Sequence, residues 1–212
     1  MEILKDIARA LQAGDDGEVA GQVRQAVDGG LSASDILDHG LIAGMDVVGR
    51  RFREREIFLP EVLLAARAMN AGVDVLKPLL VGGEVPSRGT VVLGSIQGDL
   101  HDIGKNLVGI MLKGAGYEVV DLGTDVAPEA FVDAAEERGA TVIGISALLT
   151  TTMSRMGEVV ECRDRRGLAE QIRILVGGAP LSQDFADSIG ATAYCPDAAD
   201  AVERVMDLSG EG

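Results

Sequence analysis

Residues 90–114 read TVVLGSIQGDLHDIGKNLVGIMLKG, and this stretch decides the fold. It begins with an apolar, β-branched run at 90–94 that is typical of a buried strand. A glycine-containing loop follows, and from about residue 102 the apolar residues recur at helical spacing. A strand that leads through a short loop into a helix is the repeating unit of an α/β fold.

The alternation of strands and helices continues towards the C-terminus. The strands are apolar at consecutive positions, as a parallel sheet covered by helices on both faces requires. We therefore predict a doubly wound, flavodoxin-like sheet of five parallel strands, in which ligands bind beyond the carboxyl ends of the strands where the strand order reverses. The predicted strands are 90–94, 118–122, 141–145, 173–176 and 191–194, and the predicted helices are about 102–114, 128–138, 152–166, 181–188 and 197–208.

The first 80 residues carry a different pattern, with apolar residues at three- and four-residue spacing. This spacing predicts four helices that short turns would join into a bundle. The sequence GGEVPSRG at 82–89 is rich in turn-forming residues and indicates an exposed boundary. We expect a helical domain over 1–85 and an α/β domain over 86–212. The predicted bundle helices are 2–13, 17–28, 34–53 and 60–80.

The composition limits the classes of partner. The 212 residues carry a formal net charge of −15, which argues against nucleic-acid binding because that binding depends on Lys and Arg. The N-terminus lacks the apolar segment of a signal peptide, and no apolar run reaches the roughly 18 residues that a membrane span needs. We expect a cytoplasmic protein with no membrane partner. Cys162 and Cys195 lack CxxC spacing, which predicts neither a disulfide nor a zinc site.

The loop after the first predicted strand contains His101, one of only two histidines. A loop histidine considered alone is more often a surface residue than a metal ligand. Here Asp99 precedes it by two residues, and a metal-bound histidine usually donates its other ring N–H to a carboxylate. Gly98 and Gly104 leave space for a bulky group to approach the backbone. His101 is therefore the candidate metal ligand, with Asp99 as its partner.

The loop after the third predicted strand contains Ser146 and a cluster of threonines. The first and third strands are neighbours in a doubly wound sheet, so we expect Ser146 to hydrogen-bond to Asp99. This contact would complete a proton relay from hydroxyl to carboxylate to imidazole to metal. Capping of the following helix is the alternative reading of the cluster, and it stays open for Thr151 and Thr152.

The loop after the fourth predicted strand contains Gly177 and Gly178, followed by Pro180. Two glycines before a helix that begins near a proline can form an ordinary tight turn. They can equally clear a channel for an inserted ligand, and on their own they do not decide between these readings.

Together the three loops resemble the cobalamin-binding domain shared by methionine synthase, the cobalamin-dependent mutases and the corrinoid proteins of methyltransferase systems. The three motifs occur in the family's order, each after a predicted strand. The matching positions are Asp99, His101 and Gly104 for D-x-H-x-x-G, Ser146 and Leu148 for S-x-L, and Gly177 and Gly178 for the glycine pair.

The resemblance implies that His101 replaces the cofactor's own dimethylbenzimidazole as the lower ligand of cobalt, in the base-off/His-on mode. It also implies that the detached nucleotide tail enters a cleft beside the sheet, with Tyr194 and Asp197 near the far end of that cleft. The expected cobalamin-binding residues are Gly98, Asp99, His101, Asp102, Ile103, Gly104, Ser146, Leu148, Thr150, Gly177, Gly178, Tyr194 and Asp197.

The N-terminal bundle resembles the helical cap that precedes this domain in methionine synthase and in methanol and methylamine corrinoid proteins. The resemblance rests on GMDVVG at 44–49, on Phe52 and on FLPE at 58–61. Arg55 departs from the small turn residue expected in relatives. In the family the cap shields the upper face of the corrin, although Met45 and these apolar residues can also be plain bundle core.

The resemblance implies a methyl carrier that is not catalytic alone. Its partners would be a substrate-specific methyltransferase and a second methyltransferase acting on a thiol or pterin acceptor, with a reductive activase as a further candidate. Both methyltransferases must reach one face of the cobalt, so the cap would swing aside on a hinge at 82–89.

Three other functions share parts of this pattern. A cobalamin-sensing regulator would need a DNA-binding module, which the acidic balance disfavours. The small subunit of an adenosylcobalamin-dependent mutase would not need the cap sequence at 58–61. A receiver-type signalling domain would need an acidic pocket with a phosphorylatable aspartate, which the loop containing His101 fits poorly.

Overall fold

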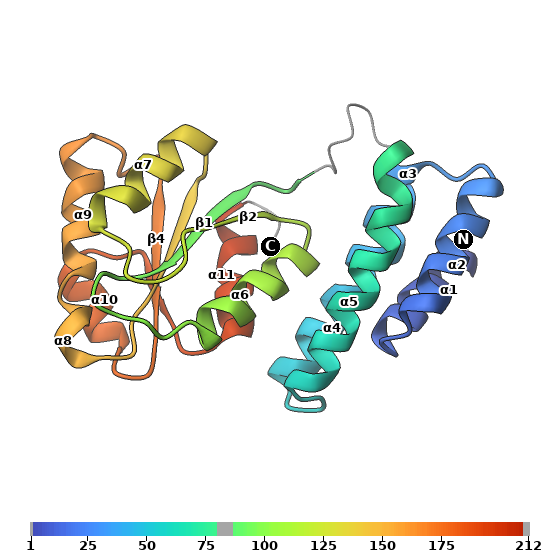
Figure 1. The fold of residues 1–212 in the computed structure, drawn as a ribbon, viewed down its shortest axis with the longest axis horizontal. Helices are drawn as coiled ribbons and strands as arrows, with labels where there is room; N and C mark the ends of the chain where they lie inside the picture. The colour runs from blue at the N-terminus through green and yellow to red at the C-terminus, as the bar shows by residue number, and fades with distance from the viewer. Residues whose placement is uncertain (1, 80–86, 210–212) are drawn as a thin grey trace. The chain divides into compact units, whose positions relative to one another are not determined.

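The computed structural model describes residues 2–79 and 87–209 (Figure 1). The described residues up to Ser87 and residues 114–116 form one compact unit, and residues 88–113 and 117–209 form the other. The predicted domain boundary at 85/86, and most of the predicted hinge at 82–89, lie outside the described residues. The exact boundary and the hinge therefore stay predictions, and each unit is considered by itself. No helix in the described ranges is long and apolar enough to cross a membrane.

The first unit is helical, as predicted. The predicted long helix at 34–53 is one helical run whose middle part is π-helical. The elements are α1 (Glu2–Gln12), α2 (Asp16–Asp28), α3 (Ala33–Ile36), the π-helix η1 (Leu37–Ile42), α4 (Ala43–Arg53), α5 (Leu59–Leu76) and the 3₁₀ turn η2 (Lys77–Leu79).

Apolar residues from each long helix form the core of this unit. Ile7 of α1, Leu41 of η1 and Val19 of α2 are fully buried. Gly72 of α5 packs against the last two: a Cβ at this position would lie 2.7 Å from Leu41 Cδ2 and 3.0 Å from Val19 Cγ1. The close approach of these helices therefore requires a glycine.

The turn between α4 and α5 contains Arg55, whose φ of 58° lies in the left-handed region that favours glycine. This conformation explains why a small residue was expected there. The turn ends at Phe58, whose backbone N–H donates to Glu61 Oε2 over 3.1 Å. The Glu61 carboxylate thus satisfies an N–H group at the start of α5.

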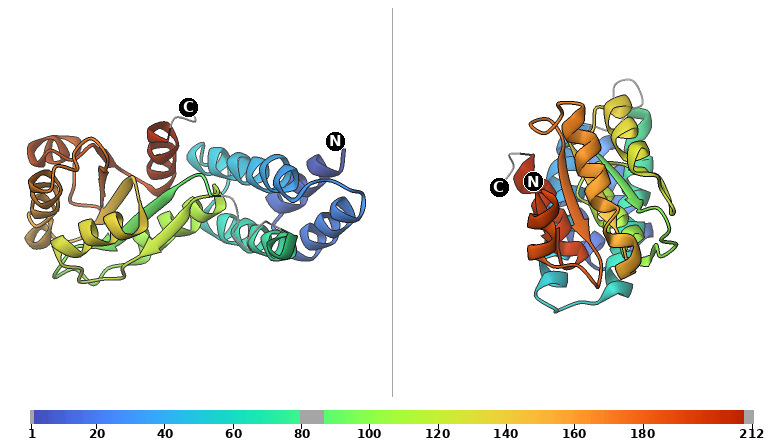
Figure 2. Two further views of the ribbon diagram at one scale, coloured as in Figure 1. Left: turned by 90° about the horizontal axis from the view of Figure 1, so that it is seen from above. Right: turned by 90° about the vertical axis from the view of Figure 1, so that its left-hand side faces the viewer.

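The second unit contains the predicted five-stranded parallel sheet, in the order β2-β1-β3-β4-β5. Figures 1 and 2 show strands of this sheet with helices around them. The strand order reverses between β1 and β3, which is the position where doubly wound sheets bind ligands. Its elements are β1 (Thr90–Ser95), α6 (Ile103–Gly114), β2 (Glu118–Asp121), α7 (Pro128–Arg138), β3 (Val142–Ser146), α8 (Thr150–Met153), α9 (Met156–Arg165), β4 (Arg173–Gly177), α10 (Gln183–Ile189), β5 (Ala193–Cys195) and α11 (Ala198–Leu208).

Alternate strand residues serve different faces of this sheet. Val92 and Ile143 are fully buried in a core that also contains Phe131 of α7 and Met156 of α9. The strand residues next to these, Val91 and Val142, face α6 and α11 on the opposite side of the sheet. The strand ends are also level, because Ser146 pairs with Ser95 on one side and with Gly177 on the other. The three loops predicted to carry chemistry therefore leave the sheet side by side.

The bundle packing can be tested with two mid-helix glycines. We expect Gly72→Ala to lower the free energy of unfolding by about 1–3 kcal/mol, because its Cβ would overlap Leu41. Gly21→Ala is the control: nothing lies within 4 Å of its added Cβ, so alanine should raise stability by about 0.5–1 kcal/mol. Urea denaturation followed by circular dichroism measures both, and a Gly72→Ala variant as stable as Gly21→Ala would contradict the packing, because both changes gain the same helix propensity.

Candidate functional site

A cavity of about 620 Å³ lies within the second unit, between one face of the sheet and helices α6 and α11. Its walls are apolar, with Val91 and Val142 from the sheet, Leu112 from α6 and Val205 from α11. Loop residues at the carboxyl ends of the strands complete the lining. A volume of this size lies within the range of about 300–1,000 Å³ that small-molecule sites occupy.

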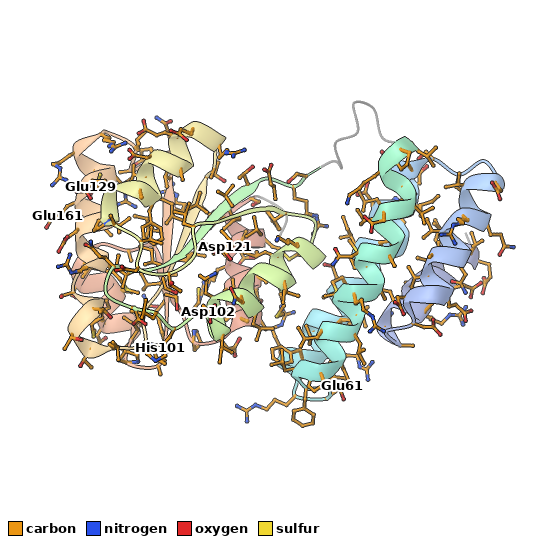
Figure 3. All side chains as sticks on the ribbon, in the orientation of Figure 1. Glu61, His101, Asp102, Asp121, Glu129 and Glu161 are labelled. Carbon is orange, nitrogen blue, oxygen red and sulfur yellow. The ribbon has the colours of Figure 1, made fainter. Side chains whose placement is uncertain are left out.

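His101 lies in this lining, in the loop between β1 and α6 (Figure 3). Its Nδ1 is 2.7 Å from Asp99 Oδ1, and its backbone N–H donates to the same oxygen over 3.0 Å. The Ser95 hydroxyl donates to the His101 carbonyl over 2.6 Å. The His101 side chain is 52% exposed. Because an ionised carboxylate can only accept, Nδ1 carries the hydrogen of this bond, and Nε2 is the ring nitrogen left for another partner.

Asp99 anchors this arrangement although it is itself fully buried. Its second oxygen, Oδ2, accepts hydrogen bonds from the backbone N–H of Leu148 over 2.7 Å, from that of Leu149 over 3.1 Å and from the Thr152 hydroxyl over 3.1 Å. Burial raises the pKa of Asp99, but the hydrogen bonds from His101, Leu148 and Thr152 outweigh it and hold the pKa well below its usual range. Asp99 therefore stays ionised at neutral pH.

The predicted hydrogen bond from Ser146 to Asp99 is not found in the described residues, and Thr152 supplies the hydroxyl instead. Ser146 ends β3 and lies on the cavity face with Val142 and Gly144, because alternate strand residues share a face. Thr152 lies six residues later on α8 and is buried against Asp99. The position of Thr152 in the threonine cluster was the sequence signal for a role at the site, but capping of the following helix was an equally open interpretation.

Lys105 is a second buried charge at the site that the sequence analysis missed. Its side chain is 3% exposed and lies 2.6 Å from both carboxylate oxygens of Asp121 at the end of β2. Burial raises the pKa of Asp121, and the hydrogen bonds from Lys105 and from the Gly123 backbone outweigh it, so that the pKa is lowered. Lys105 also lines the cavity, where it is held as half of an ion pair.

The glycines of the motifs serve different purposes. Gly178 has a φ of 138°, and a Cβ there would lie 1.8 Å from the Ala147 carbonyl oxygen, so the backbone itself excludes a side chain. A Cβ at Gly177 would lie 3.2 Å from the Cys195 carbonyl oxygen. At Gly104 an added Cβ would meet nothing within 4 Å, although this residue lines the cavity. Protein packing therefore does not explain Gly104, whereas space for a ligand would.

The remaining predicted site residues divide into two groups. Asp102, Ile103, Leu148 and Asp197 line the cavity together with His101, Gly104, Ser146, Gly177 and Gly178. Thr150 is exposed outside the lining, and Tyr194 packs against the core on the opposite face of the sheet, so their contact with a cofactor stays a prediction. Gly98 and Asp99 lie outside the lining too, where Asp99 supports His101 from behind.

Asp197 has a structural role alongside its place in the lining. Its Oδ1 accepts hydrogen bonds from the backbone N–H groups of Ala199 and Asp200, each over 2.9 Å, and so caps α11. The apolar walls were missed because their residues look like ordinary strand and helix positions in the sequence. Cys195 also lines the cavity, and it and Cys162 are both buried and unpaired.

The described residues contain no cluster of three or more His, Cys, Asp or Glu side chains that could hold a metal ion by themselves. A single imidazole at the mouth of an apolar cavity is instead suited to a metal that brings most of its own ligands. This is the chemical character of a metal held in a macrocycle.

Comparison with known families decides the assignment. A B12 binding domain family matches residues 89–206, and a second B12 binding domain family matches residues 3–77. The chain belongs to the corrinoid proteins. It is 44% identical to a corrinoid protein of Desulfitobacterium hafniense, over 100% of this chain and 99% of that protein.

Other relatives are named for methylamine substrates. Dimethylamine corrinoid protein 1 of Methanosarcina acetivorans is 43% identical, over 98% of this chain and 97% of that protein. Among solved structures, the methanol:cobalamin methyltransferase complex MtaBC from Methanosarcina barkeri matches with a TM-score of 0.89 and 34% identity, over 100% of this chain and 81% of that chain. The predicted family and fold class are thus confirmed.

The correction from Ser146 to Thr152 can be tested by stability. We expect Thr152→Val to lower the free energy of unfolding by about 1.5–3 kcal/mol, because it removes a hydrogen bond to a buried ionised carboxylate while keeping the shape of the side chain. Ser146→Ala should change it by no more than about 0.5 kcal/mol. Urea denaturation compares the two, and the reverse order of effects would restore Ser146 as the partner of Asp99.

The lowered pKa of Asp99 predicts a pH dependence. Ionised Asp99 contributes stability above its unfolded-state pKa of about 3.9, and this contribution is lost as pH falls towards the lower pKa of the folded state. The difference in unfolding free energy between the wild type and Asp99→Asn should therefore be largest near pH 7 and shrink below about pH 4. A difference that stays constant between pH 7 and pH 3 would contradict this account.

Proposed function

We propose that this chain is a methyl-carrying corrinoid protein that binds cobalamin base-off with His101 as the lower ligand of cobalt. In this proposal it passes a methyl group from a substrate-specific methyltransferase to a second methyltransferase that acts on a thiol or pterin. The observation that carries the proposal is the imidazole of His101 at the mouth of the cavity, with Nδ1 held by Asp99. The bound corrinoid would supply the cobalt that accepts and releases the methyl group.

The described residues fit such a cofactor in three respects. His101 directs its free ring nitrogen away from Asp99, as a single protein ligand must. The apolar cavity of about 620 Å³ offers room for a nucleotide tail displaced from the metal. The open space beside Gly104 lies next to His101 in the same lining. The predicted roles of Ser146, Leu148, Gly177, Gly178 and Asp197 in holding the cofactor remain part of this proposal.

The protein residues would control the ligand rather than perform the transfer. Asp99 fixes the tautomer in which Nε2 has its lone pair, because Nδ1–H is already used in the hydrogen bond. His101 would then be bound to the metal or released from it while its ring keeps the contact with the Asp99 carboxylate. Thr152 and two backbone N–H groups keep that carboxylate in place through both states.

The partners are proposed from the relatives. One protein named for dimethylamine aligns with 98% of this chain at 43% identity, and one named for trimethylamine aligns with 90% of it at 44% identity. A small methylated amine is therefore the donor class we propose, delivered by its own methyltransferase. The helical unit would cover the corrin between transfers, and a reductive activase would restore an over-oxidised cofactor. Cytoplasmic location stays a prediction.

The proposal is tested by mixing the purified protein with hydroxocobalamin. We expect the wild type to retain the cofactor through gel filtration and to show a base-off, His-on absorption spectrum. His101→Ala should bind at least about 10-fold more weakly, since loss of even an outer-shell partner of a metal ligand has an effect of that size. It should also lose the spectrum of histidine ligation.

His39→Ala is the matched control, because His39 is the other histidine and is exposed on η1 in the helical unit. This variant should behave as the wild type does. Retention and spectra that are the same in His101→Ala, His39→Ala and the wild type would remove His101 as the ligand and end the proposal.

A further inference from the structure

The segment 121–127, which is the last residue of β2 and the loop after it, contributes nothing to the lining of the cavity. It nevertheless runs beside the end of β1, where the chain leads into the His101 loop. The Ser95 backbone N–H donates to the Gly123 carbonyl over 2.9 Å, and the Val126 N–H donates to the Ser95 carbonyl over 3.0 Å. Ile96 and Val126 then form an isolated parallel bridge. Two segments far apart in the sequence are thus held together directly before the metal-ligand motif.

Asp125 holds the motif on the N-terminal side of His101. Its Oδ1 accepts a hydrogen bond from the Gly98 backbone N–H over 2.7 Å. Its own backbone N–H donates to the Asp99 carbonyl over 3.0 Å. One residue therefore contacts the main chain on both sides of the peptide that joins Gly98 to Asp99.

Asp125 reaches this position in an unfavourable backbone conformation. Its φ is 57°, and apart from Arg55 it is the only non-glycine residue in the described ranges with a positive φ. Its side chain is exposed, so burial of apolar surface does not stabilise it there. Such a conformation persists only when surrounding contacts fix it, and Asp125 contacts Gly98 and Asp99.

Asp121 holds the motif on the C-terminal side of His101. Its carboxylate binds Lys105, whose Nζ also donates to Asn106 Oδ1 over 2.7 Å. Asn106 Nδ2 in turn donates to Asp102 Oδ2 over 3.0 Å. This chain of contacts ends on the residue that follows His101. Figure 3 labels Asp121, Asp102 and His101.

We propose that the segment 121–127 is a two-point clamp that positions His101, with Asp125 fixing the chain before it and Asp121 fixing the chain after it. Both are positioning residues that act through the motif and do not touch the ligand. The inference rests on the proposed function in one respect, namely that the positioned imidazole is a metal ligand. The clamp itself is a property of the protein without cofactor.

The cofactor-free protein gives the first test. With only two histidines, ring ¹⁵N resonances are assigned to His101 by comparison with His39→Ala. The wild type should show His101 mainly as the Nδ1–H tautomer, because Asp99 accepts that hydrogen. Asp125→Gly removes the carboxylate while glycine keeps the left-handed backbone, so the tautomer population should move towards that of a free imidazole without a lower melting temperature.

Binding of hydroxocobalamin gives the second test. Asp125→Gly should weaken binding by about 10-fold, as loss of a group that orients a metal ligand typically does. Asp125→Asn should restore wild-type affinity and tautomer, because asparagine tolerates the same φ and keeps a side-chain oxygen for Gly98 N–H. Glu129→Gln, which neutralises an exposed carboxylate on the neighbouring α7, is the matched control and should change neither readout.

Asp121→Asn tests the other point of the clamp. It should move the same His101 resonances and, unlike Asp125→Gly, lower the melting temperature, because Lys105 would keep a buried charge without its carboxylate.

The possible failures can be told apart. If the wild type does not bind hydroxocobalamin, the proposed function fails while the tautomer measurement still judges the clamp. If Asp125→Gly matches the wild type and Glu129→Gln in both tautomer and affinity, the clamp is wrong and His101 ligation stands. Loss of affinity in Asp125→Asn equal to that in Asp125→Gly would also overturn it, since the hydrogen bond to Gly98 would be retained.

Discussion

The contact between the buried carboxylate of Asp99 and the imidazole of His101 is the interaction on which the site depends. A fully buried carboxylate is unfavourable unless its lone pairs are satisfied, and here backbone and side-chain donors from two loops satisfy them. Those donors come from the ends of β1 and β3, which are adjacent only because the sheet reverses its strand order between them. The fold thereby holds the Asp99 carboxylate in place, and this carboxylate orients the His101 ring in the cavity lining.

This dependence explains why the surrounding glycines and charges are arranged as they are. Gly178 lets the loop after β4 pass close to the Ala147 carbonyl, directly before the N–H groups that bind Asp99. Lys105 is buried beside the cavity, where an unpaired cation would be unfavourable, and its pairing with Asp121 ties α6 to the end of β2. The rim of the cavity is therefore a connected set of hydrogen bonds, whereas its walls are apolar.

The sequence predicts the fold and the contact between Asp99 and His101, for physical reasons. The periods of apolar residues set the elements, and the five strands and the helices around them follow. Asp99 and His101 are two residues apart, so one loop conformation brings them together and local reasoning suffices. Thr152 was left undecided because its contact with Asp99 spans 53 residues and depends on how α8 turns after β3. The clamp residues were missed for the same reason.

Tyr194 shows the limit of pattern reasoning at a single position. Successive strand residues alternate between faces, and the apolar pattern of a buried strand does not say which of two adjacent residues faces the cavity. Cys195, the next residue, lines the cavity, while Tyr194 packs against the opposite core. Membership of the family follows from matches over residues 3–77 and 89–206, but the assignment of individual residues needs the structure.

The lower ligand of cobalt is proposed to be a histidine nitrogen of this protein and not the cofactor's own base. Electron paramagnetic resonance of the cobalt(II) form tests it most directly, with protein whose histidines carry ¹⁵N and cobalamin of natural isotopic abundance. A ¹⁴N ligand gives superhyperfine triplets, and we expect doublets in the labelled protein because its ligand is ¹⁵N. We expect these doublets to be absent from labelled His101→Ala. Triplets that persist in the labelled protein would show that the dimethylbenzimidazole remains bound, and would contradict the account.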